Sequence, residues 1–175
     1  MLIVWILAGV VGLFLLILLV GSFLPERYDS DLRARFAATP EEVWAAAQDV
    51  RRHPHAGKQC REVTDVRDDT EQRGWTEDLG SSQIAYETLE AERPVRLVRR
   101  ARDKRINVNF HVTLTLEADG EGTKVRSRTE TNVRKGSWHI PVFRALLKLS
   151  DGANRANRDW LQRLGASLGS EPQFD

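Results

Sequence analysis

Two histidines and the only cysteine lie close together in the sequence and are the first residues to consider for chemistry. His53 and His55 are two positions apart, and Cys60 follows shortly after. Zinc needs three or four well-spaced ligands, and neither a CxxC nor an HExxH motif supplies them. A nucleophilic cysteine needs a nearby base and an electropositive setting. We therefore expect exposed loop histidines, a cysteine that contributes to packing, no metal site and no cofactor.

Other titratable residues lie at isolated positions. His139 precedes the last helical segment, where a general acid–base role is conceivable, although ordinary loop placement is the simpler interpretation. His111 falls on the polar face of a strand. Asp78, Glu87 and Arg99 are possible interior charges, for which a solvated position is the default expectation. Because no P-loop, GxGxxG or GxSxG motif is present either, no catalytic residue is assigned and an enzymatic role stays open without being favoured.

A run of hydroxyl side chains shares one face of a predicted strand. Between residues 123 and 134, charged side chains alternate with Val125, Ser127, Thr129, Thr131 and Val133. This period of two places the hydroxyls on the inward face. Each buried hydroxyl needs a hydrogen-bond partner. The strand therefore either lines a partly polar cavity or forms hydrogen bonds with neighbouring strands or a buried water.

The segments that position these residues have clear strand or helix patterns. Thr39, Pro40 and Glu42 mark the start of a helix that ends near Asp49. Strands are predicted over 31–36, 61–66, 74–79, 83–91, 95–102, 106–116 and 123–134, with a hairpin loop at 118–122. Residues 141–168 have apolar side chains at helical spacing. Consecutive strands followed by one long helix predict an α+β domain with an antiparallel sheet.

This order of elements resembles the helix-grip superfamily of START-like and birch-pollen-allergen-like proteins (SRPBCC), in particular its polyketide cyclase/dehydratase-like branch. The resemblance is carried by RFAATPEEVW at 35–44, YETLEAERPVRL at 86–97, the hairpin at 120–125 and the terminal helix. It covers residues 29–168, which we predict to form one domain, followed by a loose tail over 169–175. The resemblance implies a curved antiparallel sheet of six or seven strands wrapped around a long C-terminal helix.

The resemblance also implies a cavity for apolar or amphipathic ligands between the sheet and the helix, but it carries no catalytic motif. Apolar walls with a few polar groups suit such a pocket. The expected lining comes from two inward strand faces and the helix: Phe110, Val112, Ser127, Thr129, Thr131, Phe143, Leu147, Ser150, Asn154 and Asn157. One departure is that Pro54 is followed by His55-Ala-Gly, where many relatives have an aromatic residue.

An apolar run precedes the domain. Residues 2–24 carry no charge, and about 20 apolar residues in a helix cross a hydrocarbon core of about 30 Å. A cleaved signal peptide is the alternative interpretation, because residues 20–22 are small. That alternative is opposed by the length of the run and by the lack of a preceding Lys or Arg. Arg27, Arg33 and Arg35 follow, so the positive-inside rule predicts a single-pass membrane protein with its domain on the cytoplasmic side.

Together these features predict a membrane-anchored binding or transfer module for a hydrophobic small molecule of lipid, polyketide or isoprenoid type. The alternatives are a cyclase/dehydratase-type enzyme and a protein-binding scaffold with a packed interior. The 26 Lys+Arg and 25 Asp+Glu residues are interleaved, so nucleic-acid binding is not indicated, and no protein partner is suggested. Trp138, Ile140, Val142 and Phe143 could form an apolar entrance or touch the bilayer, and core packing explains them equally well.

Overall fold

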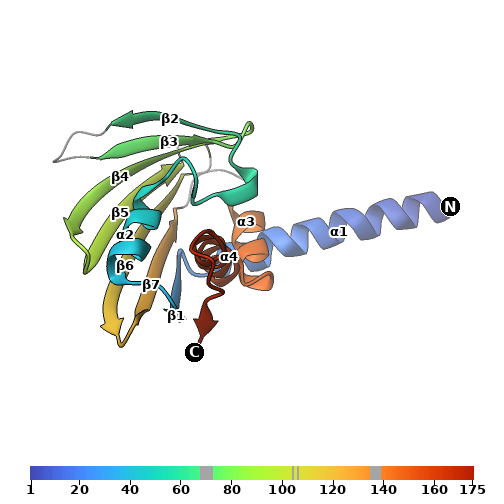
Figure 1. Ribbon diagram of the computed structural model, residues 1–175. Helices are drawn as coiled ribbons and strands as arrows, with labels where there is room; N and C mark the ends of the chain where they lie inside the picture. The colour runs from blue at the N-terminus through green and yellow to red at the C-terminus, as the bar shows by residue number, and fades with distance from the viewer. Residues whose placement is uncertain (68–72, 104, 106, 135–138) are drawn as a thin grey trace.

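An N-terminal helix leads into a curved sheet whose concave face is covered by helices (Figure 1). The computed structural model describes residues 1–67, 73–103, 105, 107–134 and 139–175. The helices are α1 Leu2–Phe23, α2 Pro40–Gln48, α3 Ile140–Leu149 and α4 Gly152–Ser167, with a 3-10 helix at Gly57–Gln59. The strands are β1 Arg27–Phe36, β2 Glu62–Arg67, β3 Gly74–Asp78, β4 Gln83–Glu92, β5 Arg96–Asp103, β6 Val108–Asp119, β7 Gly122–Val133 and β8 Gln173–Phe174.

The strands form one antiparallel sheet in the order β2-β3-β4-β5-β6-β7-β1-β8, which confirms the predicted α+β helix-grip architecture. The eighth strand is the two-residue β8, which pairs with β1 at Ala34 and Arg35. Residues 169–175, expected as a loose tail, therefore end in a strand. The connection between the predicted strands 61–66 and 74–79 falls largely outside the described residues.

The local patterns that predicted these elements have the expected physical causes. Thr39 caps α2 through a capping box, in which the Glu42 carboxylate accepts a hydrogen bond from the Thr39 backbone N–H at 2.8 Å. On β6 the period of two is kept, because Val112 and Leu114 are buried whereas His111 is exposed. The sequence pattern thus indicated correctly which face of β6 packs against the helices.

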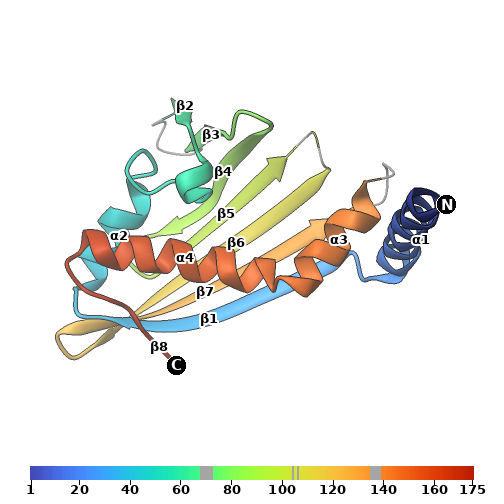
Figure 2. The ribbon, with the colours of Figure 1, turned by 90° about the vertical axis from the view of Figure 1, so that its right-hand side faces the viewer.

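The prediction of one continuous helix over 141–168 was wrong, because the helix is interrupted between α3 and α4. Asp151 has a left-handed backbone with φ of 50°, a conformation that aspartate tolerates better than most residues. The Ser150 hydroxyl donates to the Leu146 carbonyl at 2.7 Å and so helps to end α3. Figure 2 shows α3 and α4 in succession across the concave face of the sheet.

The apolar core has three parts along the concave face. The main cluster lies where α2 and α4 cross the sheet, and it includes the fully buried Phe36, Leu161 and Leu164. A second cluster surrounds Trp75 on β3 to β5. The third packs Ile140 of α3 against the neighbouring ends of β6 and β7. These clusters fix the helices that face the candidate site.

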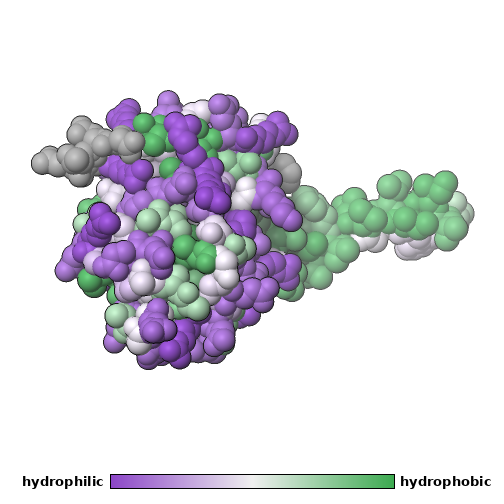
Figure 3. Space-filling model, viewed as in Figure 1, coloured by the Kyte–Doolittle hydropathy of each residue, from purple (hydrophilic) through white to green (hydrophobic). Residues whose placement is uncertain are grey.

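Helix α1 extends away from the domain, and its apolar surface is exposed (Figure 3). By length and composition it could cross a membrane, although a signal sequence passes the same test. Gly21 is the buried residue of this helix, and it lies against α3.

Candidate ligand-binding site

The interior between sheet and helices is not equally closed along its length. Near α2 it is closed, because Leu97 and Leu114 are each only 1% exposed. At the other end Ile140 of α3 packs on the buried Val108 and Val133, and between these two regions some inward side chains are more accessible. Six of the ten residues predicted to line a pocket gather there: Phe110, Thr129, Phe143, Leu147 and Asn154 are partly exposed, and Val112 is 9% exposed. We call this region the open end of the interior.

The strand register explains why the β6 and β7 members of this group meet. Phe110 pairs with Thr131, and Val112 pairs with Thr129. Both pairs lie toward the end of the β6–β7 hairpin that is opposite its turn and is covered by α3. Thr131 itself is buried, at 3% exposure. Inward residues on neighbouring strands form rows across the sheet, so one row carries an aromatic ring and a hydroxyl side by side.

Ser127 and Asn157 do not belong to the open end, because their polar groups bond to each other. The Ser127 hydroxyl donates to Asn157 Oδ1 at 2.7 Å. The Asn157 amide donates to the Ser30 hydroxyl and to the Ser127 carbonyl, each at 3.0 Å. All three residues are buried. We call this group the serine–asparagine lock, and it joins α4 to β7 and β1. Ser150, the remaining predicted lining residue, is exposed and bonds within its own helix.

A buried charged group lies on the other side of the open end. The side chain of Glu77 on β3 is fully buried, and its oxygens accept hydrogen bonds from the backbone N–H groups of His55 and Ala56 at 2.9 and 2.8 Å. The Trp75 indole donates to the same carboxylate at 3.1 Å. Burial raises the pKa of Glu77, and these hydrogen bonds oppose that rise. Glu77 therefore anchors the loop after α2 to the sheet.

Arg99 on β5 completes this group. It donates to the Ala47 carbonyl at 2.9 Å, lies 3.1 Å from Nε2 of His55 and sits 4.8 Å from the centre of the Trp75 ring. Burial lowers the pKa of Arg99 to about 9, with a contribution from the charge of Arg73. Its partner in the register is Val112, so this cation borders the open end.

The His55 ring is enclosed by aromatic rings. It stacks on Trp160 of α4 at a centroid distance of 4.6 Å and on Tyr86 at 5.3 Å. Burial and then the neighbouring Arg99 charge hold the pKa of His55 well below its ordinary value, so the ring is neutral at pH 7. His55 thus supplies a flat ring directly after Pro54.

The expectation of exposed loop histidines was wrong, because His53 is buried, at 8% exposure, and His55 is only partly exposed. The expectation of a solvated position was likewise wrong for Arg99, whose side chain is buried. Glu77, for which no interior position was predicted, is a fully buried carboxylate, whereas Asp78 is only partly buried and Glu87 forms an ion pair with Arg100 at 2.6 Å. The alternation along each strand could have indicated these buried positions. Glu77 lies two residues from Trp75 and so shares its face of β3, and Arg99 likewise shares the face of Leu97 and Ala101 on β5.

The other residues considered for chemistry have ordinary surroundings. Burial raises the pKa of the Cys60 thiol, which donates to the Glu62 carbonyl at 3.3 Å, so the protonated form is favoured. His139 is partly exposed at the start of α3. Within the described part of the chain, no three His, Cys, Asp or Glu side chains come close enough together to hold a metal ion.

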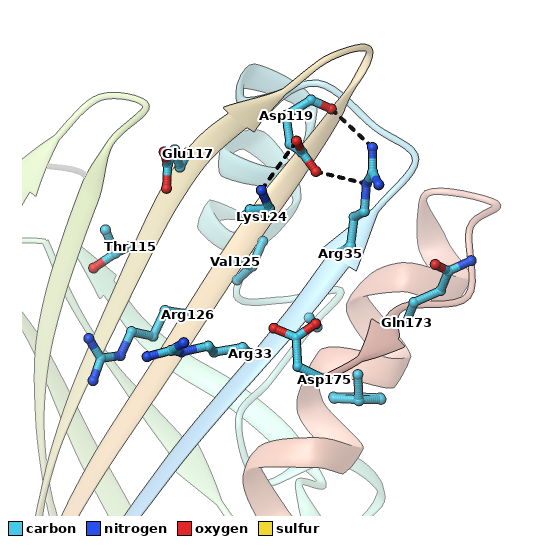
Figure 4. Close-up of a pocket in the computed structure, with 12 residues that line it drawn as sticks. Arg33, Arg35, Thr115, Glu117, Asp119, Lys124, Val125, Arg126, Gln173 and Asp175 are labelled. Atoms are coloured by element: carbon cyan, nitrogen blue, oxygen red, sulfur yellow. Dashed lines mark hydrogen bonds and ion pairs between the residues drawn. The ribbon is translucent and has the colours of Figure 1, made fainter.

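The outer face of the sheet is charged where it is hollowed. A groove of about 870 Å³ lies between β8 and the outer faces of β1, β6 and β7. Figure 4 shows Arg35 and Lys124 reaching Asp119 across it, at 3.0 and 3.3 Å. These paired charges would lose solvation if an apolar molecule covered them. The outer groove is therefore a poor site for an apolar ligand.

Comparison with known proteins identifies the fold. No protein-family model matches the sequence, and no curated protein matches it. The protein TTHA0849 from Thermus thermophilus superposes with a TM-score of 0.60 at 16% identity, over 80% of this chain and 99% of that one. The Zhui aromatase/cyclase from Streptomyces sp. R1128 gives 0.57 at 12% identity, over 81% and 94% of the chains. Ara h 8.0201 gives 0.55 at 10% identity, over 82% and 99%. The chain thus has the helix-grip fold expected from its resemblance to the SRPBCC superfamily.

Proposed function

We propose that this protein is a membrane-anchored module that binds or transfers an apolar or amphipathic small molecule. The molecule is held at the open end of the interior, between the sheet and helices α3 and α4. The observation that carries this proposal is the contrast in exposure within the interior. Side chains near α2 are closed off from solvent, whereas Phe110 and Thr129 on the inward strand faces and Leu147 of α3 are partly exposed.

The composition of the open end suits an amphipathic ligand. Aromatic and aliphatic walls come from Phe110, Phe143 and Leu147, and a hydroxyl group comes from Thr129. Such a mixture of apolar walls and few polar groups is typical of small-molecule sites. Similarity in fold to a protein named an aromatase/cyclase is compatible with binding of an extended or ring-forming carbon chain.

The anchor is supported by how α1 meets the domain. Arg144 of α3 donates to the Leu24 carbonyl at 3.5 Å, and Gly21 packs against Pro141. A signal peptide that is removed after export would have no need of such contacts with the folded domain. Arg27 and Arg33 follow α1 directly and favour the cytoplasmic side for the domain.

The test is native mass spectrometry of the full chain, incubated with a membrane lipid extract and released from detergent. We expect a specific small-molecule adduct on the wild type. Thr129→Trp fills the open end and should abolish the adduct. Thr113→Trp is the matched control, because Thr113 is also partly exposed but lies on the outer face of β6. It should keep the adduct.

The outcomes separate the alternatives. Adduct loss in both variants, or in neither, would contradict a site at the open end. A wild type that carries no adduct under any condition would favour a protein-binding scaffold. Thermal unfolding of Thr129→Trp provides the check that its fold is intact, and Thr129→Leu serves as a smaller replacement if the tryptophan is not tolerated.

A further inference from the structure

Helix α3 has apolar side chains on two opposite faces. One face packs into the domain through Ile140 and Ala145, both buried. The other carries Val142, Leu146 and Leu149, at the i, i+4, i+7 spacing of a single helix face. Leu146 is 58% exposed and Leu149 is 85% exposed. We call these three residues the α3 strip.

The α3 strip stands out on the described surface. Among the described residues after α1, the large hydrophobic side chains that are exposed are Leu89, Val95, Leu146 and Leu149, and Leu149 is the most exposed of them. Isolated exposed leucines are common in soluble proteins, but neighbouring leucines on one helix face mark a contact surface. The remaining question is which partner covers them.

Buried contacts fix α3 beside the root of α1. The backbone of Pro141 approaches Gly21 so closely that no side chain fits at that position. Arg144, itself 1% exposed, donates to the Val133 carbonyl at 2.6 Å and pairs with Glu26 at 3.4 Å. The Tyr28 hydroxyl donates to the Arg144 carbonyl at 3.3 Å. These contacts orient α3 relative to α1 without relying on a flexible linker.

This orientation places α3 on the side from which α1 leaves the domain. Figure 2 looks nearly along α1 from its N-terminal end, and α3 and α4 lie in front of the sheet in that view. A 22-residue helix is about 33 Å long, close to the roughly 30 Å of a hydrocarbon core. A bilayer crossed by α1 would therefore have its surface near Phe23, next to α3.

We propose that the α3 strip is embedded in the surface layer of the same bilayer leaflet, as an interfacial amphipathic helix. The proposal rests on the membrane anchor of the proposed function. Continuity with α1 favours lipid over a second protein, because α1 and α3 pack side by side. Lys148, exposed in the last turn of α3, is long enough to reach the head groups while its stem stays apolar. Phe143 and Leu147 of the open end would then lie beside the lipid.

The test measures the depth of single positions in vesicles. In full-length protein with Cys60→Ser, a cysteine replaces Leu149, Leu89 or Leu15 and is labelled with an NBD fluorophore. The proteins are reconstituted into phosphatidylcholine–phosphatidylglycerol vesicles with and without doxyl-labelled lipid. We expect the lipid quencher to at least halve emission at 149 and at 15, and to leave emission at 89 unchanged. Leu89 is the control, as an exposed apolar residue on β4.

Each other outcome has a definite meaning. If position 15 is quenched and position 149 behaves like 89, the α3 strip is not in lipid although the anchor stands. If neither 15 nor 149 is quenched, the anchor itself is refuted. A label at 149 that is shielded from aqueous iodide but not quenched by lipid would indicate a protein partner or a second copy, and would overturn the proposal. Leu146→Cys repeats the measurement one turn earlier.

Discussion

Removing the Asn157 side chain tests whether the serine–asparagine lock is a dry structural contact. Asn157→Ala deletes three hydrogen bonds, one accepted from the Ser127 hydroxyl and two donated, to Ser30 and to the Ser127 carbonyl. At a net value of about 1 kcal/mol each, these bonds account for about 3 kcal/mol of the free energy of unfolding. The hydroxyls left behind in a buried site add about 1–2 kcal/mol.

Asn154→Ala is the matched control, one turn earlier in α4. Asn154 donates to Asp151 at 2.9 Å, but it is only partly buried and bonds within its own helix. Its loss should cost below about 1 kcal/mol. Both substitutions gain the same helix propensity from alanine, about half a kcal/mol, so that gain cancels in the comparison. The expected difference between the two variants is therefore at least about 3 kcal/mol.

The assay is urea unfolding of the full chain in a mild detergent, followed by tryptophan fluorescence. Trp75 and Trp160 are buried in the domain and report its unfolding. Equal and small losses in both variants would refute the reasoning, because they would mean that water or a ligand already occupies the lock. Ser127→Ala and the double variant then measure the coupling, which should lie within about 1–3 kcal/mol for directly bonded side chains.

Two further predictions concern the buried ring and the helix junction. Because the pKa of His55 is lowered by burial, the unfolded chain takes up a proton first as pH falls below the ordinary histidine value of about 6.5, so the domain loses stability there. The measurement is the Tm of the domain at pH values from 8 to 5.5. His55→Gln should reduce the fall in Tm over this range, whereas the same substitution at exposed His111 should leave the fall as in the wild type. Gly21→Leu should separate α1 from α3 and lower the Tm of the domain, while Gly12→Leu, whose side chain would meet nothing within 4 Å, should not; equal Tm values for the two leucine variants would show that the junction is not a stabilising contact.

Strand and helix positions could be predicted because their local causes are strong. The capping box at Thr39 and Glu42 and the alternation on β6 act over a few residues, and both persist in the structure. The break at Asp151 could not be predicted in the same way. Apolar side chains at helical spacing continue across it, and the left-handed conformation depends on how α3 and α4 each pack on the sheet.

The candidate site could be predicted only in part, because the alternation along a strand indicates which face a side chain lies on and not which residue it contacts. Ser127 and Thr129 lie on the same face of β7. One is bonded to Asn157 and the other is partly exposed, and the difference arises from where α4 crosses β7. The buried ion group at Glu77 and Arg99 was missed for another reason. A general expectation that charges are solvated outweighed the alternation that was present in the sequence.

The lock also limits what the open end can hold. Ser127 lies six residues before Val133, the end of β7, and at about 3.3 Å per residue this gives about 20 Å along the strand. Only the rows through Val112–Thr129 and Phe110–Thr131 lie between these limits. A ligand bound at the open end as proposed would therefore meet the serine–asparagine lock within a short distance along β7. On that proposal the site favours a single acyl or isoprenoid segment, or a compact ring system, over a complete two-chain lipid, and Asn157→Ala should lengthen the chains that the protein retains.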